Sequence, residues 1–341
     1  MTIGVKANIL VGDNRTRLKE IPDQSVQCVV TSPPYWGLRD YGTGTWIGGD
    51  ESCSHRRDSK KSDLTITGHK NADEMLGVGD AIYKDECPRC GAKREDEQIG
   101  LEITPEAYVE ELCKVFDEIW RVLKDDGTLW LNLGDTYVGR GSKGDATDPK
   151  HAEGRNGQVV ALNNKVQGLK TKDLIGIPWR VAFALQARGW YLRQDIVWSK
   201  PNPMPESVAD RCTKSHEYIF LLTKSPRYYF NNEAIKEKAL TGEDDASRNK
   251  RDVWVVPVKA YPEAHFAVYP TELIAPCVLA GSKEGDTILD PFSGSGTTGE
   301  VALSLGRNYI GTELNPEYAK LSEKRIGDAI GMFGEVSVNG L

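Results

Sequence analysis

Apolar residues gather in short runs along much of the chain, and polar residues or glycines separate these runs. Runs with the length of buried strands occupy residues 7–13, 26–30, 128–133, 191–198, 217–223, 287–289 and 308–315. The runs at 191–198 and 217–223 are close neighbours in the chain and predict a pair of strands side by side.

Two longer segments between these runs repeat apolar side chains at helical spacing. Residues 104–124 predict one helix, which Thr104 can cap, Pro105 can begin and Gly127 can end. Residues 173–188 predict a second helix. Its inward face would carry Leu174, Ile177, Val181 and Leu185. Strands that alternate with helices predict an α/β fold, doubly wound around a mainly parallel sheet.

Two polar stretches break this alternation. Residues 37–100 and 139–172 are rich in glycine or charge and show no sustained periodicity. Long loops inside a compact domain are usually functional or disordered. We therefore expect a single domain over residues 1–341, with both stretches inserted as loops that flank a binding cleft.

The composition is that of an ordinary soluble protein, with 39% hydrophobic and 27% charged residues. No apolar run approaches the ~18 residues that span a bilayer, and we expect a cytoplasmic protein that contacts no membrane. Seven cysteines, an odd number, argue against a disulfide framework. The net charge of −7 disfavours a polyanionic partner unless basic residues cover the contact face, and they do gather at residues 55–61 and 248–251.

A Ser-Pro-Pro-Tyr segment follows the run at 26–30. Its two prolines end the sheet ladder and fix the backbone. Ser32 and the carbonyl of Pro33 can offer acceptors beneath the ring of Tyr35, which suits a planar substrate with an exocyclic amino group. The alternative is a proline-rich turn that only closes a strand.

A glycine-rich loop at residues 290–299 lies between a predicted strand and a helix over 300–305. This arrangement presses backbone amides against a ligand at a helix N-terminus. Its spacing is neither that of a dinucleotide-binding loop nor that of a phosphate loop. Glu313 ends the next strand, about 20 residues further on, where a carboxylate can hold a ribose diol. An adenosine-containing cofactor is the best match.

Together the two motifs resemble the amino-group DNA methyltransferases that use S-adenosylmethionine, in the beta arrangement. That family has its catalytic motif near the N-terminus and its cofactor loop near the C-terminus, as here. Further matching segments are residues 12–14, 127–135, 198–202 and 265–270. The resemblance implies a seven-stranded sheet, double-stranded DNA as substrate, and a bacterial or phage-infected host cell. A homodimer and a cognate restriction endonuclease stay open as partners.

The resemblance also assigns residues. The catalytic set is Ser32, Pro33, Pro34 and Tyr35. The cofactor set is Asp13, Asp290, Phe292, Gly294, Gly296, Thr297, Thr298, Glu313 and Asn315. The set expected to contact DNA is Lys200, Arg248, Lys250 and Arg251, the last three within a candidate recognition region at 225–264.

Within these sets, Ser32 and the Pro33 carbonyl would accept hydrogen bonds from the target amino group, and Tyr35 would stack on the flipped base. Phe292 would cover the cofactor adenine, and the amides of residues 294–298 would hold its methionine end. A serine at the head of the motif resembles the cytosine-N4 branch, and adenine-N6 stays open. A protein or RNA amino methyltransferase and a catalytically silent DNA-binding module are further alternatives.

Two pairs of metal-ligand residues bracket the first insertion. Cys53 and His55 stand two positions apart, and Cys87 and Cys90 form a Cys-x-x-Cys followed by glycine. Such pairs are half-sites for tetrahedral zinc, and a metal crosslink would hold a segment that lacks an apolar core. We expect one closed, structural zinc site. The alternative is a flexible loop with incidental thiols.

Overall fold

Nine strands form one sheet in the computed structural model, in the order β10-β6-β7-β5-β2-β11-β12-β1-β13. The structure describes residues 4–37, 41–55, 83, 86–139, 166, 168–239, 246–259, 268–330 and 334–340. The strands of this sheet are β1 (Val5–Val11), β2 (Val26–Thr31), β5 (Leu123–Leu133), β6 (Tyr191–Ser199), β7 (His216–Thr223), β10 (Val253–Val255), β11 (Thr287–Asp290), β12 (Asn308–Glu313) and β13 (Gly334–Asn339).

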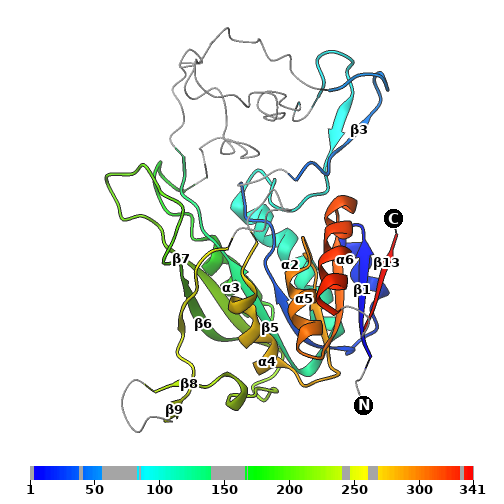
Figure 1. Cartoon of the computed structure of the whole chain (residues 1–341). Coiled ribbons are helices and arrows are strands. Elements are labelled where there is room, and N and C mark those ends of the chain that lie inside the picture. The colour runs from blue at the N-terminus through cyan, green and yellow to red at the C-terminus, as the bar shows by residue number, and fades with distance from the viewer. Residues whose placement is uncertain are drawn as a thin grey trace, which may run out of the picture.

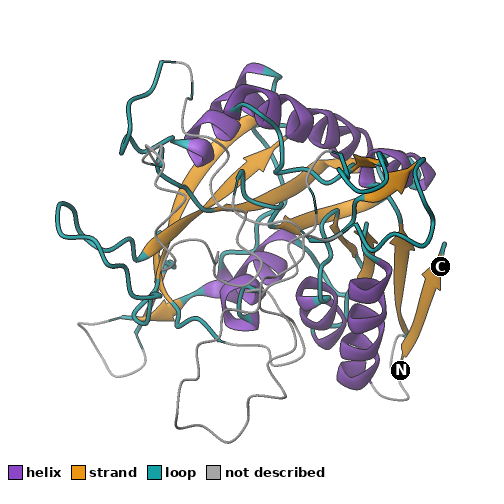
Figure 2. Cartoon of the chain, turned by 90° about the horizontal axis from the view of Figure 1, so that it is seen from above, coloured by secondary structure: helices purple, strands orange, loops and turns teal. Residues whose placement is uncertain are grey.

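Helices cover both faces of the sheet (Figures 1 and 2). They are α1 (Asn14–Arg17), α2 (Pro105–Val122), α3 (Ile177–Ala187), α4 (Thr271–Gly281), α5 (Thr297–Ser304) and α6 (Pro316–Ile330), with short 3-10 turns η1 (Leu18–Glu20) and η2 (Glu233–Ile235). One hydrophobic core packs α2 and α3 against the sheet. A second core packs α4, α5 and α6 against the opposite face. The doubly wound α/β fold is therefore confirmed.

Among the described strands of the sheet, β7 alone runs antiparallel to both of its neighbours. The seven central strands are those that the resemblance implies, and two edge strands extend the sheet to nine. One is β10, beside β6, and the other is β13, beside β1. No described helix is both long enough and apolar enough to cross a bilayer.

The first predicted helix forms as α2, capped by the hydroxyl of Thr104, which accepts a hydrogen bond from the Ala107 amide at 3.1 Å. The predicted end at Gly127 was wrong, because β5 begins at Leu123, directly after the helix. The second helix begins at Ile177 rather than 173, and Leu174 is 48% exposed instead of facing inward. Pro178 explains the late start, because proline favours the first helical turn and disfavours helix before it.

Two small antiparallel sheets lie outside the main one. β3 (Thr45–Ile47) pairs with β4 (Lys93–Glu95), and β8 (Glu237–Lys238) pairs with β9 (Ser247–Arg248). Figure 1 places the β3 hairpin beyond one end of the main sheet and the β8–β9 pair at the other. Most of the predicted loop 139–172, and the basic residues from 56 to 61, lie outside the described residues.

The chain reverses its winding direction between β2 and β11. These strands are parallel neighbours, but the chain leaves β2 through α2 toward β5, and leaves β11 through α5 toward β12 on the other side. Connections that diverge in this way open a crevice at the carboxyl ends of the two strands. The Ser-Pro-Pro-Tyr segment follows β2 and the glycine-rich loop follows β11, so the fold brings both motifs to one crevice.

Candidate active site

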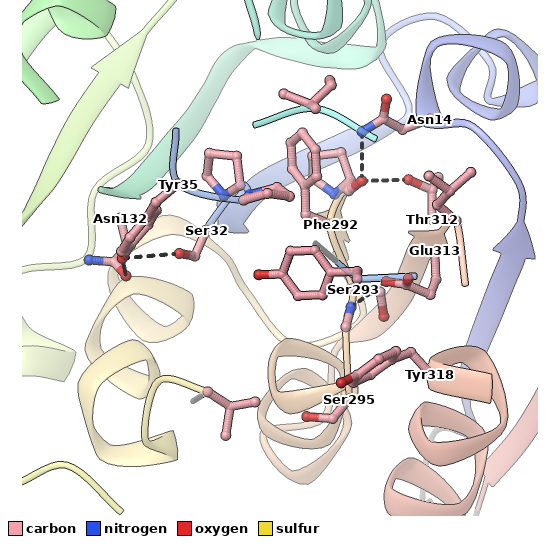
Figure 3. Close-up of a pocket in the computed structure, with 18 of the residues that line it drawn as sticks. Asn14, Ser32, Tyr35, Asn132, Phe292, Ser293, Ser295, Thr312, Glu313 and Tyr318 are labelled. Carbon is pink, nitrogen blue, oxygen red and sulfur yellow. Dashed lines mark hydrogen bonds between the residues drawn. The ribbon is translucent and has the colours of Figure 1, made fainter. Parts of the chain in front are cut away.

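A cavity of about 260 Å³ lies at this crevice and is lined by both motifs (Figure 3). Residues from the first motif that line it are Ser32, Pro33, Pro34 and Tyr35. Residues from the second motif and the strand after it are Phe292, Gly294, Thr297 and Glu313. Thr31, at the end of β2, donates a 2.6 Å hydrogen bond to the Asp290 carboxylate at the end of β11. This buried bond locks the two motif-bearing strands together.

One wall of the cavity is a hydrogen-bonded cluster around the Tyr35 hydroxyl. The hydroxyl lies 2.7 Å from Glu217 Oε2, 3.2 Å from Asn132 Oδ1 and 3.5 Å from the Ser32 hydroxyl. Burial, together with the negative charge of Glu217, raises the pKa of Tyr35 well above its usual range. Tyr35 therefore stays neutral. Among the described residues, no donor is hydrogen-bonded to the Pro33 carbonyl, which leaves it available to a ligand.

Lys200 belongs to this same wall. Its ammonium forms an ion pair with Glu217 and lies 4.2 Å from the centre of the Trp198 ring. Asn132 also donates to Glu217, at 3.3 Å. The sequence suggested Lys200 as a DNA contact, and the structure places it inside the cavity beside Tyr35. We call Tyr35, Asn132, Lys200 and Glu217 the tyrosine cluster.

Sequence reasoning did not single out Asn132 or Glu217 as site residues. Asn132 is only 4% exposed and lies among the apolar residues that end β5, and Glu217 directly precedes the apolar run of β7. A polar residue in a buried strand must be hydrogen-bonded, and this is the signal that could have identified both.

Gly134 leaves the space that the Tyr35 ring occupies. A Cβ atom at this position would lie 2.4 Å from Cε2 of the ring. The ring position therefore depends on a residue without a side chain, at the end of β5.

The opposite wall is formed by the glycine-rich loop and Glu313. The Glu313 carboxylate accepts hydrogen bonds from the amides of Gly294 at 2.8 Å and Asn315 at 2.9 Å. Burial raises the pKa of this carboxyl group to about 7. Figure 3 shows the Glu313 carboxylate facing the loop, with Phe292 above it and Tyr318 below it in this view. We call this the loop wall.

Asp290 is 1% exposed and does not line the cavity. Its carboxylate accepts four hydrogen bonds, from the hydroxyls of Thr31, Tyr269 and Thr298 and from the amide of Phe292. Burial raises its pKa. Asp290 and Thr298 therefore hold the loop from its buried side, and Phe292 faces the cavity on the other side.

Two backbone amides of the glycine-rich loop are already hydrogen-bonded within the protein. The amide of Gly294 is taken by Glu313, and the amide of Gly296 donates to the Ser293 carbonyl at 2.9 Å. Gly296 has a φ of 81°, and a Cβ there would lie 2.4 Å from the Ser322 hydroxyl. A ligand at this wall would therefore meet the first turn of α5, where Thr297 lines the cavity, rather than these two amides.

The end of β1 also reaches the cavity. β1 pairs with β12, so Asp13 lies near Glu313 and lines the pocket. The Asp13 carboxylate caps α1 and forms an ion pair with Arg15. Asn14 is buried and donates a 3.1 Å hydrogen bond to the carbonyl of Pro291. Asn315 does not line the cavity but donates to the Tyr41 carbonyl at 3.3 Å.

Both ends of the first insertion return to the cavity. Lining residues from these ends are Tyr41, Thr43, Glu97, Gln98 and Ile99. The sequence showed only a polar stretch here, without periodicity, and did not identify them.

The four predicted metal ligands come together outside the cavity, beside the β3–β4 hairpin. Ligand atoms of Cys53, His55, Cys87 and Cys90 all lie within 4.8 Å of one another.

The basic residues at 248–251 lie far from the cavity. Arg248 and Arg251 both donate to the Glu237 carboxylate, at 2.9 and 2.7 Å, and the Lys250 ammonium lies 4.9 Å from the centre of the Trp254 ring. These residues precede β10, which runs parallel to β6, and the cavity lies at the carboxyl end of these strands. They therefore lie at the amino ends of these strands, at the end of the sheet opposite the cavity (Figure 1).

Known proteins resemble this chain over most of its length. A family model for N6/N4 methyltransferases, described as DNA methylase, matches residues 26–324. The chain is 44% identical to the Type II methyltransferase M.Cfr9I of Citrobacter freundii over 320 residues, which cover 94% of this chain and 87% of that protein. It is 43% identical to the Type II methyltransferase M.SmaI of Serratia marcescens, with 93% and 90% covered.

Two solved structures share the fold. The PvuII DNA methyltransferase (cytosine-N4-specific) superposes with a TM-score of 0.58 and 16% identity, covering all of this chain and 97% of that one. A putative DNA modification methylase of Thermus thermophilus, solved with S-adenosyl-L-methionine, superposes with a TM-score of 0.56 and 22% identity, covering 98% of this chain and 100% of that one.

Proposed function

Because the chain belongs to the N6/N4 family of DNA methylases, and is a Type II DNA methyltransferase that uses S-adenosylmethionine, we propose that it methylates the N4 amino group of cytosine in double-stranded DNA. The observation that carries this proposal is that both motifs line one cavity. A methyl donor on one wall and an amino group on the other would lie within reach of each other.

On the loop wall we place the adenosine of the cofactor. The ionised Glu313 carboxylate keeps lone pairs for the two ribose hydroxyls while it accepts the two backbone amides. Phe292 would cover the adenine, with Asp13 at its edge. The methionine carboxylate would lie at the first turn of α5, near Thr297, where the helix dipole favours a negative charge.

On the other wall we place the target base. The amino nitrogen of cytosine is a poor nucleophile because its lone pair is delocalised into the ring. Hydrogen bonds from its two hydrogens to the Ser32 hydroxyl and the Pro33 carbonyl would favour a tetrahedral nitrogen with a localised lone pair. This lone pair would form the new N–C bond as the S–C bond breaks and sulfur keeps that electron pair, and one amino proton would then pass to solvent water. The methyl sulfonium is already activated, so positioning supplies much of the acceleration.

The target base would have to leave the duplex, because its amino group is otherwise paired and the reacting atoms meet inside a cavity. Tyr35 would stack on the flipped base. Glu217 and Asn132 hold the Tyr35 hydroxyl and so fix the ring against which the base would lie.

Cytosine is preferred to adenine because a serine heads the catalytic motif, as in the cytosine-N4 branch that the sequence resembles. The test is to incubate the purified protein with duplex DNA and S-adenosylmethionine carrying a deuterated methyl group, digest the DNA and identify the nucleosides by mass spectrometry. We expect labelled N4-methyldeoxycytidine. Labelled N6-methyldeoxyadenosine would move the specificity to adenine, and labelled 5-methyldeoxycytidine would contradict amino transfer itself.

Two finer expectations about partners also remain predictions: a homodimer, and a cognate restriction endonuclease that cleaves the same unmethylated sequence. Light scattering of the purified protein tests the first. The second predicts that extracts of the source cell cleave unmethylated DNA and spare DNA that this enzyme has methylated.

A further inference from the structure

We propose that the first insertion binds one zinc ion through Cys53, His55, Cys87 and Cys90. The Sγ atoms of Cys53 and Cys87 lie 3.8 Å apart, and Cys90 Sγ lies 3.5 Å from His55 Nδ1. Tetrahedral zinc, with Zn–S of about 2.3 Å and Zn–N of about 2.0–2.1 Å, separates two sulfur ligands by about 3.8 Å and a sulfur from a nitrogen by about 3.6 Å. Both observed separations match those values.

The backbone around the Cys-x-x-Cys pair presents both sulfur atoms to the same side. The Gly91 amide donates to the Cys87 carbonyl at 2.7 Å, and the Cys87 amide donates to the Ala92 carbonyl at 2.8 Å. Gly91 has a φ of 75°, a conformation that glycine adopts without strain. These two hydrogen bonds close the turn and bring the two sulfur ligands close to each other.

The second half-site packs against the first. The ring of His55 stacks on Trp46 of β3, with ring centres 4.4 Å apart and planes 14° from parallel. Gly49, between Trp46 and Cys53, lies so close that a Cβ there would be 2.8 Å from the sulfur of Cys90. Stacking fixes the imidazole plane and directs Nδ1 toward the three sulfur atoms.

A disulfide does not account for this cluster. All seven cysteines are free thiols, and a separation of 3.8 Å between Cys53 and Cys87 is far from the ~2.05 Å of a disulfide bond. Three thiolates and one imidazole are the ligands of structural zinc sites, and four protein ligands leave no open position for substrate. The cluster would therefore stabilise the fold of the insertion and take no part in methyl transfer.

The site would support a wall of the cavity indirectly. The metal site lies beside the antiparallel β3–β4 pair. The chain before β3 carries Tyr41 and Thr43, the chain after β4 carries Gln98, and all three line the cavity. The Tyr41 amide donates to the Gln98 side chain at 2.7 Å, which joins these two segments. In the described part of the hairpin, Ile47 is 54% exposed, so apolar burial alone gives this segment little stability. A metal that binds only the folded hairpin would supply it.

Elemental analysis of the full-length protein, purified without chelators, tests the proposal. We expect about one zinc per chain in the wild type, and a loss of at least about tenfold in Cys87→Ser and Cys90→Ser, because each removes one of four ligands. Cys212→Ser is the matched control, since Cys212 is an exposed thiol outside the cluster. It should keep its zinc.

X-ray absorption at the zinc edge of the wild type does not depend on the folding of any variant. We expect three sulfur neighbours at about 2.3 Å and one nitrogen at about 2.0–2.1 Å. Retained affinity for S-adenosylmethionine in Cys87→Ser would show that zinc loss is local. Three results would each overturn the proposal. One is wild-type protein, expressed with added zinc, that carries less than about a tenth of an equivalent of zinc. The others are zinc with only oxygen and nitrogen neighbours, and full zinc content in Cys87→Ser.

Discussion

The two walls of the cavity are built in opposite ways. The loop wall comes from one continuous stretch after β11 together with Glu313 at the end of the next strand, and backbone amides hold its one carboxylate. The tyrosine cluster draws on β2, β5, β7 and the end of β6, and side chains hold one another there. We propose that the loop wall holds the cofactor and that the tyrosine cluster holds the target base.

If this division is correct, variants on the tyrosine cluster side should lose turnover and keep the cofactor. Ser32→Ala removes one of two acceptors for the target amino group, and we expect turnover to fall by about 10²-fold or more. Calorimetry should give an unchanged dissociation constant for S-adenosylmethionine. Tyr35→Ala should behave in the same way. An equal loss of cofactor binding in folded Ser32→Ala protein would break the division.

Gly134→Ala sharpens the comparison because it moves the Tyr35 ring without touching any polar group. The added methyl would lie 2.4 Å from the ring, so the ring must shift, and a misplacement near 1 Å can cost about 10²-fold in rate. We expect a fall in single-turnover rate somewhat smaller than for Ser32→Ala, with cofactor affinity retained. Gly327→Ala in α6, where nothing lies within 4 Å of the new Cβ, is the matched control. Equal rates in the two variants would mean that the ring position does not matter.

Glu313 should show the opposite behaviour, with cofactor affinity as the property that changes. Its pKa is raised to about 7, so the carboxyl group is protonated below that pH and ionised above it. If the ionised form accepts both ribose hydroxyls, as we propose, affinity should weaken by about tenfold from pH 8 to pH 6. Glu313→Gln should bind the cofactor more weakly at pH 8 and show little pH dependence. A wild-type affinity that is flat over this range would remove the carboxylate from the ribose.

The smallest effect, on DNA affinity, is expected at the amino ends of the strands, away from the cavity. Arg251 shares Glu237 with Arg248 and lies away from the cavity, so Arg251→Ala should change DNA affinity by no more than about twofold. Filter binding over a range of salt concentrations measures this. A fall above about tenfold with a shallower salt dependence would place the DNA at this end of the sheet, as the sequence alone suggested.

The same division explains what the sequence could predict. The loop wall is contiguous, so its motif and the spacing to Glu313 are visible in one stretch of sequence. Glu217 and Asn132 reach Tyr35 only through the antiparallel pairing of β5 with β7, which brings together residues 85 positions apart. Residues 97–99, which line the pocket, could not be identified from the sequence for a similar reason. The chain returns to the cavity there only after a long insertion. Local patterns predicted the seven central strands and the helices α2, α3 and α5, but not α4, α6 or the edge strands β10 and β13. The distant pairings needed the fold.

A crystal structure of the enzyme with S-adenosylhomocysteine tests the division between the walls most directly. We predict the ribose hydroxyls on Glu313, the adenine against Phe292 and the sulfur directed toward Ser32. The space beside Tyr35, Asn132 and Glu217 should hold no part of the cofactor. An adenosine bound against Glu217 and Lys200, with Glu313 facing the homocysteine or nothing, would contradict the assignment of both walls.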